Sequence, residues 1–432
     1  MAEVRPFKGL RYSVTESRPL DHLICPPYDI ISPEEQQALQ RRSSYNAIHL
    51  ELPEDDARDD RYSVAAQALG RWRKEGVLAQ DSKPIYYLLR QRFHHRGKSM
   101  ERWGLMACVR LEEFSRRIVL PHEETGAGPK EDRLKLMKAC RTNFSPIMML
   151  YRDPQHQLRS ALAKVIETPP VASATYARDE EVAFWVVDAS RLRDTISATF
   201  QNAQLFIADG HHRYETALAY RDLMRQQSPG WSDKDAFNYV MATLIDFDDP
   251  GLLVLPYHRT ASGLSAPTLT AVRHRLQETF QIQAFPQQPT TPEALEDAVL
   301  HQEKGVSLGL LGPDGEGPYL LTLRSGAAVS KLRTLPGGAA LIDSEGWVLH
   351  QAVLEPALGN ADRFLSYTHD PREAWDNVVN GQQQLAFFLK PFPMDLFQAV
   401  VSTGQRLPRK STYFQPKLPT GVVFNLLEGA ID

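Results

Sequence analysis

Polar residues that could carry out chemistry are concentrated in one short segment, Ala208-Asp209-Gly210-His211-His212-Arg213-Tyr214-Glu215. The apolar run before it, residues 204–208, is typical of a strand, and residues 211–226 have the apolar spacing of a helix. We therefore predict that a strand runs directly into a helix N-terminus. Asp209 is suited to cap the first turn, and Gly210 would let a ligand come close to backbone N–H groups. Such a corner binds anions through amide donors and the helix dipole.

The side chains of this segment have the chemistry of a nucleotide phosphate site. His212 and Arg213 supply donors, and Arg213 could form paired hydrogen bonds with phosphate oxygens. Glu215 follows His211 by four residues, so the two lie on the same side of the helix and could act as acid and base or hold a divalent ion. The alternative is a helix with a capping Asp209 and solvated histidines. The density of costly polar groups at one corner favours the functional interpretation.

A second reactive cluster, Pro121-His122-Glu123-Glu124-Thr125, follows the strand expected at residues 117–120. Paired carboxylates beside a histidine could assemble Mg²⁺ with phosphate oxygens, or remove a proton from an attacking hydroxyl. An exposed acidic turn is the alternative. We predict Glu123 and Glu124 as catalytic together with His211 and Glu215, and Glu123 and Asp209 as metal ligands. The predicted cofactor-binding residues are Asp209, Gly210, His212, Arg213, His122, Thr125 and Lys130.

Two other segments are candidates for substrate contacts. In Pro26-Pro27-Tyr28-Asp29 the prolines stiffen the loop, so Tyr28 could meet a base or substrate and Asp29 a metal or substrate amine. A turn in which Asp29 caps neighbouring backbone is the alternative. Near the C-terminus, Lys410-Ser411-Thr412-Tyr413-Phe414-Gln415-Pro416-Lys417 has the basic and hydroxyl groups of a phosphate-contacting loop, with Lys410 and Ser411 as candidates. A structural clamp that ties the tail to the core is equally compatible with this segment.

The elements that must position these residues form a mixed pattern. Ser32-Pro33-Glu34-Glu35 has a capping serine, a proline at the first helical position and a glutamate three residues after the cap. It predicts a helix over residues 33–41. Further helices are expected at 61–75, 130–140, 211–226, 348–358 and 381–389, and strands at 84–92, 101–111, 117–120, 146–151, 183–187, 205–208, 306–311 and 319–323. We predict an α+β (mixed α/β) fold, with a catalytic region over 1–265 and an α/β C-terminal region over 266–432 packing on it.

Composition narrows the class of protein. The 432 residues are 42% hydrophobic and 24% charged, which is typical of a globular chain large enough for two or three units. The formal charge of −4 gives no overall attraction to nucleic acid. The three cysteines lack CxxC spacing, and no stretch approaches the ~20 apolar residues of a membrane helix. We expect a cytoplasmic protein with a small-molecule substrate and neither nucleic acid nor membrane as partner, and leave a homodimer open.

The central segment resembles a known signature. Gly210-His211-His212-Arg213-Tyr214-Glu215-Thr216-Ala217 is similar to the Gly-x-x-Arg-x-x-x-Ala box of the ParB and sulfiredoxin-like superfamily, in which this corner holds nucleotide phosphates. His211 stands where sulfiredoxins have their reactive cysteine, so sulfinic reductase chemistry by that cysteine is excluded. The resemblance implies a ParB/sulfiredoxin-like catalytic core. The free-serine kinases of the superfamily use the corner to transfer phosphate from a nucleotide to serine.

A longer resemblance is to the bacterial and archaeal domain-of-unknown-function family numbered one thousand and fifteen. Its phrases recur almost along the whole chain, as Arg5 to Leu10, Pro26 to Ser32, His122 to Thr125, Ala208 to Ala217 and Lys410 to Lys417. This resemblance implies an association with serine biosynthesis.

Together these observations predict a nucleotide-dependent kinase for a small hydroxylated metabolite such as L-serine, with ATP or ADP and Mg²⁺ as cofactors. A metal-dependent phosphatase or nuclease-like hydrolase, with His211, His212 and Glu123 as metal ligands, is the first alternative. A nucleotide-binding switch protein without turnover is the second.

Overall fold

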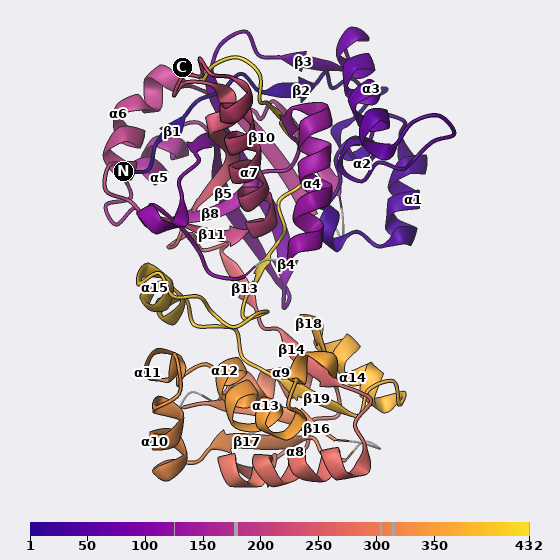
Figure 1. The fold of residues 1–432 in the computed structure, drawn as a ribbon, viewed down its shortest axis with the longest axis vertical. Coiled ribbons are helices and arrows are strands. Elements are labelled where there is room, and N and C mark those ends of the chain that lie inside the picture. Colours follow the sequence, from indigo (N-terminus) through magenta and orange to yellow (C-terminus); the bar gives the residue numbers. More distant parts are fainter. Residues whose placement is uncertain (125, 177–179, 303–304, 313–315, 432) are drawn as a thin grey trace. The chain divides into compact units, whose positions relative to one another are not determined.

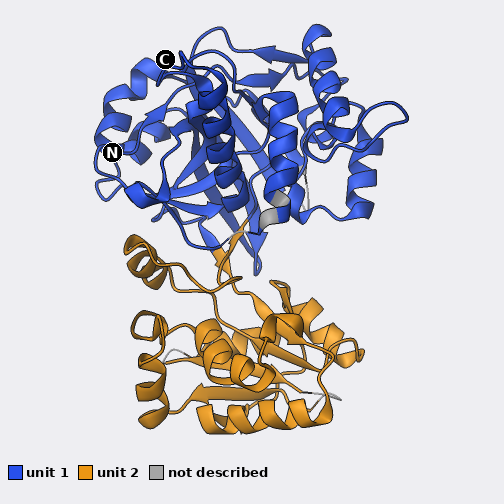
Figure 2. Cartoon of the chain, viewed as in Figure 1, with its two compact units in different colours: residues 1–253, 416–432 blue, residues 254–415 orange. Residues whose placement is uncertain are grey.

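The chain divides into two compact units in the computed structural model, which describes residues 1–124, 126–176, 180–302, 305–312 and 316–431. The first unit comprises Met1–Leu253 and Pro416–Asp432, and the second comprises Val254–Gln415 (Figure 2). The sequence had placed the boundary at 265 and the whole C-terminus in one region. The last residues instead belong to the first unit because their backbone pairs with it, as in the bridge between Cys25 and Thr420.

A mixed sheet forms the centre of the first unit (Figure 1). In the described part of the chain it has nine strands, in the order β6-β11-β8-β12-β5-β4-β10-β9 with β1 beside β5. The pairs β6–β11 and β8–β12 are parallel and the others antiparallel. The strands are β1 (Val4–Arg5), β4 (Ile85–His95), β5 (Lys98–Arg110), β6 (Val119–Pro121), β8 (Ile147–Tyr151), β9 (Ala172–Tyr176), β10 (Glu180–Asp188), β11 (Leu205–Asp209) and β12 (Tyr239–Asp246).

Helices cover this sheet through their apolar faces. One buried cluster joins side chains of the strands to Leu158 and Leu162, Leu192 and Ile196, and Tyr214 and Ala217, from three different helices. The helices are α1 (Pro33–Arg42), α2 (Ile48–Glu51), α3 (Arg61–Lys74), α4 (Ala127–Cys140), α5 (Gln157–Ala163), α6 (Ala189–Phe200) and α7 (His211–Gln227). Figure 1 shows α4 and α7 side by side, and they are in contact. Short strands pair at the margins as β2 (Leu10–Tyr12) with β3 (Leu78–Gln80) and β7 (Thr142–Asn143) with β21 (Asn425–Leu426).

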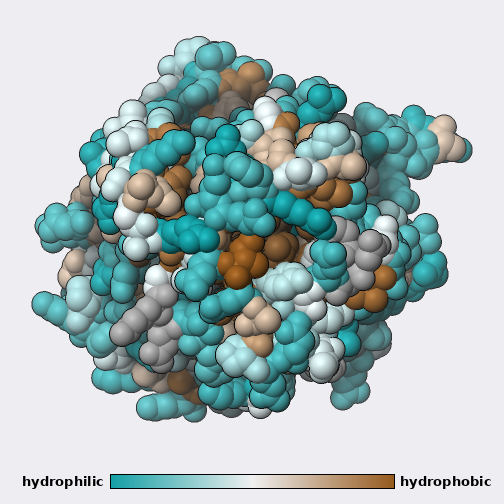
Figure 3. All heavy atoms as spheres, turned by 90° about the horizontal axis from the view of Figure 1, so that it is seen from below, coloured by the Kyte–Doolittle hydropathy of each residue, from teal (hydrophilic) through white to brown (hydrophobic). Residues whose placement is uncertain are grey.

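The second unit has its own sheet, with strand order β15-β17-β16-β19-β14-β18 and antiparallel pairing throughout its described strands. These strands are β14 (His258–Ala261), β15 (Phe280–Ala284), β16 (Ser307–Leu311), β17 (Tyr319–Leu323), β18 (Leu365–Thr368) and β19 (Leu385–Phe388), and β13 (Leu253–Leu255) pairs separately with β20 (Tyr413–Gln415). Its helices are α8 (Ala266–Thr279), α9 (Pro292–Leu300), α10 (Ala327–Arg333), α11 (Gly338–Leu341), α12 (Glu345–Leu349), α13 (Glu355–Leu358), α14 (Pro371–Val379) and α15 (Met394–Ser402), with a π-helical turn at His350–Leu354 between α12 and α13. The face in Figure 3 is mostly hydrophilic, with hydrophobic residues gathered near its centre.

The predicted mixed α/β class is confirmed, and most predicted elements lie within a few residues of their observed positions. The Ser32 hydroxyl accepts a hydrogen bond from the Glu35 amide at 3.2 Å and caps α1 as expected. The helix predicted over residues 381–389 is wrong, because Leu385–Phe388 is strand β19. All four residues of β19 are buried, and a short apolar run of this kind has no periodicity that separates a central strand from a buried helix. Among the described helices, none has the length and apolar character needed to cross a bilayer.

Candidate functional site

The predicted strand-to-helix corner is present. Strand β11 ends at Asp209, helix α7 begins at His211, and Gly210 joins them with a φ of 92°. The positive φ favours glycine, and a β-carbon at this position would lie 3.0 to 3.1 Å from the guanidinium of Arg213, which would have to shift slightly. Among the described residues, no side chain caps the first turn of α7. The expected cap by Asp209 is therefore not formed, and the start of α7 is suited to an external anion.

Asp209 is instead held between two cations. Its Oδ2 accepts a hydrogen bond from Nη2 of Arg213 at 2.7 Å, and its Oδ1 pairs with Nζ of Lys417. Nη1 of Arg213 also donates to the carbonyl of Pro146 at 2.7 Å. Burial by itself would raise the pKa of Asp209, but Lys417 and Arg213 lower it to about 2. We call Asp209, Arg213 and Lys417 the corner anchor, because their contacts fix the turn between β11 and α7.

The second reactive cluster lies directly beside the corner. Strands β6 and β11 are parallel, with Pro121 opposite Ile207, so the two strands end at the same edge of the sheet. The His122 amide donates to Nε2 of His211 at 3.3 Å, and Nδ1 of His122 lies 2.7 Å from the carbonyl of Ile207. The two rings are 4.5 Å apart and nearly perpendicular. The two clusters are therefore neighbours in the structure, and their membership of one functional site stays a prediction.

The protonation of His122 follows from these contacts. Since a carbonyl only accepts, Nδ1 of His122 carries the proton, which leaves Nε2 as the unprotonated nitrogen of the neutral ring. Nε2 lies 3.8 Å from Oε1 of Glu123. Burial lowers the pKa of His122, although the negative charge of Glu123 opposes this shift. A neutral histidine thus stands beside a partly exposed carboxylate.

His212 and Lys130 lie on the α4 side of the corner. Nζ of Lys130 pairs with Oε2 of Glu215 at 2.8 Å, and Nε2 of His212 accepts from the amide of Gly126 at 3.1 Å. Burial lowers the pKa of His212, and Lys130 acts in the same direction. Glu215, Asp29 and Glu123 oppose that shift, so their charges are all close enough to act on this ring. Three segments that are distant in the sequence therefore meet around His212, namely those at Asp29, at residues 123–130 and at residues 212–215.

The loop with two prolines reaches the same region. Tyr28 to Ile30 form a short 3₁₀ helix, and the guanidinium carbon of Arg133 lies 4.4 Å from the centre of the Tyr28 ring. Burial raises the pKa of Tyr28 to about 12, so its hydroxyl stays protonated. Asp29 is exposed, and its charge acts on both His212 and Arg213. Asp29 is thus a carboxylate on the solvent side of the corner.

Glu51 is a buried carboxylate near the site that the sequence did not single out. It is 2% exposed at the end of α2, and its Oε1 accepts from the Ser145 hydroxyl at 2.9 Å. Burial raises the pKa of Glu51, while Arg133 and Arg213 oppose this. A cavity of about 40 Å³ lies between these groups and Thr216. A lone glutamate in a four-residue helix has no spacing pattern that could have identified it.

Comparison with known proteins gives the family. A family model described as "Protein of unknown function (DUF1015)" matches residues 4–338. The chain belongs to this family. The resemblance to this family is therefore confirmed over residues 4–338, and the ParB and sulfiredoxin-like description stays a prediction. No curated protein matches this DUF1015 member.

Among solved structures, the chain is similar to a conserved hypothetical protein from Pyrococcus furiosus, with 13% identity over 75% of this chain and 95% of that one and a TM-score of 0.34. A free serine kinase variant in complex with ADP gives 13% identity over 74% and 91% of the two chains and a TM-score of 0.35. SbnI with a C-terminal truncation, from Staphylococcus aureus, gives 10% identity over 74% and 87% and a TM-score of 0.37. Scores at this level assign no function to the DUF1015 chain.

The predicted substrate residues Lys410 and Ser411 lie in the second unit of this DUF1015 protein. Nζ of Lys410 lies 3.4 Å from the Tyr257 hydroxyl and 5.0 Å from the centre of that ring, and the Ser411 hydroxyl donates to the carbonyl of Pro408 at 2.6 Å. These contacts are within the second unit. Lys417, at the end of the same predicted segment, is the residue that joins the corner, as the clamp alternative described. Thr125 lies outside the described residues.

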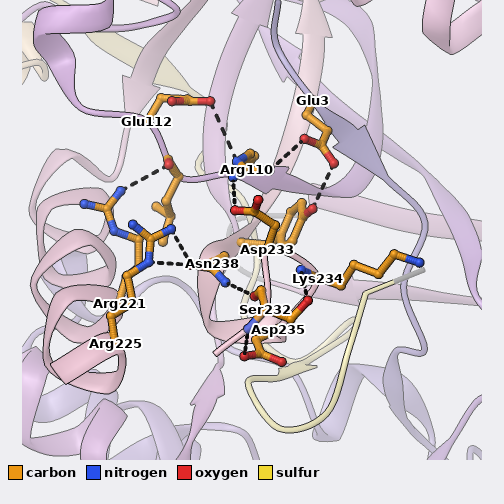
Figure 4. Close-up of polar contacts among 12 residues, drawn as sticks. Glu3, Arg110, Glu112, Arg221, Arg225, Ser232, Asp233, Lys234, Asp235 and Asn238 are labelled. Carbon is orange, nitrogen blue, oxygen red and sulfur yellow. Dashed lines mark hydrogen bonds and ion pairs between the residues drawn. The ribbon is translucent and has the colours of Figure 1, made fainter. Parts of the chain in front are cut away.

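A separate polar network supports the far end of α7 (Figure 4). Arg110 pairs with Glu3 at 3.3 Å and also with Asp233, and Nη2 of Arg225 donates to Oδ1 of Asn238 at 2.7 Å. These groups come from the residue before β1, from β5, from α7 and from the segment before β12. Because their charges and amides are engaged with one another, we assign this network to the anchoring of α7 and the N-terminal strand.

Proposed function

We propose that the chain is a nucleotide-dependent phosphotransferase that acts on a small hydroxylated metabolite, with L-serine as the first substrate to test. The observation that supports this most is the arrangement around the start of α7. There an N-terminus without a side-chain cap adjoins Lys130 and His212, with the Glu123 carboxylate beside them. Anion-binding donors next to a carboxylate are the two parts that phosphoryl transfer needs.

In this proposal the first turn of α7 holds the nucleotide phosphates through its backbone N–H groups, with His212 and Lys130 as side-chain donors. The corner anchor contributes by position and charge. The corner anchor contains one carboxylate and two cations, so it has one net positive charge. This charge lies next to the turn that Gly210 forms. Fixed charge of this kind stabilises a transferring phosphoryl group without reorganisation during the reaction.

Glu123 is the carboxylate that we assign as general base. It would accept the proton of the substrate hydroxyl while the hydroxyl oxygen bonds to the terminal phosphorus and the bond from phosphorus to the leaving nucleotide oxygen breaks. His122 is buried beside it, with Nε2 3.8 Å from Oε1 of Glu123. Glu215 is paired with Lys130 and orients that donor, which fits a positioning role better than a basic one.

The magnesium ion and the substrate remain to be placed. Mg²⁺ would supply charge neutralisation at the phosphate oxygens when bound. Among the described residues no group of three side chains is gathered in a way that could hold a metal ion, so the nucleotide would supply most of its ligands and Glu124 or Asp29 would supply a carboxylate. Asp209 is less suited, because both of its oxygens face cations. Asp29 would alternatively hold the ammonium group of a serine-like substrate beside Tyr28.

The test compares product formation by the wild type, Glu123→Gln and Glu131→Gln with ATP or ADP, Mg²⁺ and L-serine. Glu131 offers the same substitution on an exposed part of α4, where it pairs only with Lys135 among the described residues. We expect phosphoserine, detected by mass spectrometry, from the wild type and Glu131→Gln. The Glu123→Gln variant should be slower by about 10² or more. Equal rates for Glu123→Gln and wild type would overturn the assignment of the base.

A nucleotide-binding measurement distinguishes a role of Glu123 as general base from a role in binding the nucleotide phosphates. Isothermal titration of ADP into Glu123→Gln should give an affinity within about threefold of wild type if Glu123 acts mainly in the transition state. Replacing Arg213 would be a poor control, because its guanidinium holds both Asp209 and Pro146 and its loss would disturb the whole corner.

A further inference from the structure

A second pocket in the first unit lies away from the corner. Its volume is about 250 Å³, and it lies between the sheet and α5. Its walls are mainly apolar and include Leu88, Trp103, Leu105, Leu162 and Leu244. A concave, largely apolar pocket with a few polar groups is the usual form of a small-molecule site, and the volume of this one suits a ligand smaller than a typical drug.

The polar part of this pocket is Asp246, at the end of β12. Asp246 is 5% exposed, and its Oδ1 accepts from the Asp248 amide at 3.2 Å. Its Oδ2 is buried and has no hydrogen-bond partner among the described residues. The nearest side-chain nitrogen is Nδ1 of His156, 3.9 Å away on an exposed ring. A buried carboxylate oxygen without a donor is costly, and a ligand that supplies one would remove that cost.

Other carboxylates surround Asp246. Burial raises the pKa of Asp246, and the charges of Asp248 and Asp153 add to this. Asp249 also lines the pocket, but its oxygens accept the amides of Gly251 at 2.8 Å and Trp103 at 3.3 Å. Arg159 is the cation that lines the pocket. The balance of charge around Asp246 is therefore negative, which favours a cationic ligand.

We propose that this pocket binds a small organic cation, whose ammonium group donates to Oδ2 of Asp246 while its apolar body packs against the leucines and Trp103. An aromatic ring carrying a short aminoalkyl chain has a suitable size and form. The same volume and wall chemistry would reject a ligand with several charges.

The site is distinct from the corner described above. In the β8–β11 pairing, Asp209 lies opposite Met148. Tyr151, which lines the pocket, is three positions after Met148 on β8. Along a strand, three positions correspond to a distance of about 10 Å. No pocket-lining residue belongs to the corner anchor or to the proposed catalytic residues. The proposal therefore does not depend on the kinase assignment.

The experiment titrates phenethylamine into the full chain and follows binding by calorimetry and by ligand-observed NMR. Its uncharged analogue 2-phenylethanol has a similar apolar body and lacks the ammonium group. The matched variants are Asp246→Asn and Asp194→Asn, the second on the exposed face of α6. We expect saturable binding of phenethylamine, with 2-phenylethanol weaker by about fivefold or more. Asp246→Asn should weaken phenethylamine by a similar factor, and Asp194→Asn should leave it unchanged.

A second variant fills the pocket without changing its charge. Ala163 lines the pocket from an exposed position on α5, so Ala163→Trp should block entry while the helix is retained. Thermal melts of all variants establish that they fold. Absence of saturable binding to the wild type, or equal binding by wild type, Asp246→Asn and Ala163→Trp, would overturn the proposal.

Discussion

Replacing Lys417 by methionine should lower the free energy of unfolding of the first unit, because it removes one of the two cations of the corner anchor. The Lys417 side chain is 10% exposed and pairs with Asp209, whose other cation is Arg213. Burial raises the pKa of Asp209 and the two cations lower it, and the net result is a change from 3.8 to about 2 that corresponds to about 2–3 kcal/mol of stability at neutral pH. Lys417 lowers the Asp209 pKa more than Arg213 does, so its removal should lower the free energy of unfolding by about 2 kcal/mol. This is less than the cost of a buried charge with no partner, because Arg213 still pairs with Asp209.

The assay is urea unfolding followed by hydrogen exchange of peptides from the first unit, because a chain with two units need not unfold in one step. Lys234→Met is the matched control, since Lys234 is exposed and outside the anchor. The control should stay within about 0.5 kcal/mol of wild type. A Lys417→Met variant as stable as this control would refute the anchor.

The pH dependence of unfolding is a second test of the Lys417→Met variant. A carboxyl whose pKa is lowered by folding contributes stability that is present above its unfolded pKa of 3.8 and is lost as the pH falls toward about 2. The difference between wild type and Lys417→Met should therefore be constant from about pH 7 to pH 5 and become smaller below about pH 4. A difference that grows on acidification would contradict the assigned charges.

Four further predictions concern single positions. Gly210→Ala should lower stability by about 1–2 kcal/mol and weaken ADP binding, because of its φ of 92° and the nearby Arg213 guanidinium; unchanged melting and titration curves would contradict this. Burial lowers the pKa of His212, so its contribution to stability is present above pH 6.5 and is lost as the pH falls through its folded value. His212→Gln should flatten that loss in melts between pH 7 and pH 5, and an unchanged profile would count against it. If Asp29 holds a substrate ammonium, Asp29→Asn should raise the KM for serine by about fivefold or more with little change in kcat; a change in kcat alone would exclude that role. Asp246→Asn should melt no lower than wild type at pH 7, because the substitution removes a charge that burial disfavours, and a large fall in Tm would show that the carboxylate is needed for folding.

Local structure around the site could be predicted from the sequence because its signals are local. The serine and proline at the start of α1, and the apolar run followed by Asp209 and Gly210, each specify backbone conformation within a few residues. The same holds for α7, whose predicted range differs from the observed helix by one residue.

Contacts between distant segments could not be derived in this way. The meeting of His122 and His211 depends on the parallel pairing of β6 and β11, which are separated in the chain by three helices and several strands. Lys417 reaches Asp209 because the chain returns from the second unit to the first, and no sequence pattern indicates that return. The resemblance to the family pointed to the C-terminal segment, but it did not indicate which of its members, Lys410 or Lys417, lies at the corner.

Phosphorus NMR of the protein with ADP or ATP, Mg²⁺ and L-serine tests the central claim most directly. The kinase proposal predicts that a phosphate monoester signal grows as the terminal phosphate signal of the nucleotide declines, with Glu131→Gln like wild type and Glu123→Gln strongly slowed. Release of inorganic phosphate without a monoester, or nucleotide signals that stay unchanged in the wild type, would contradict it.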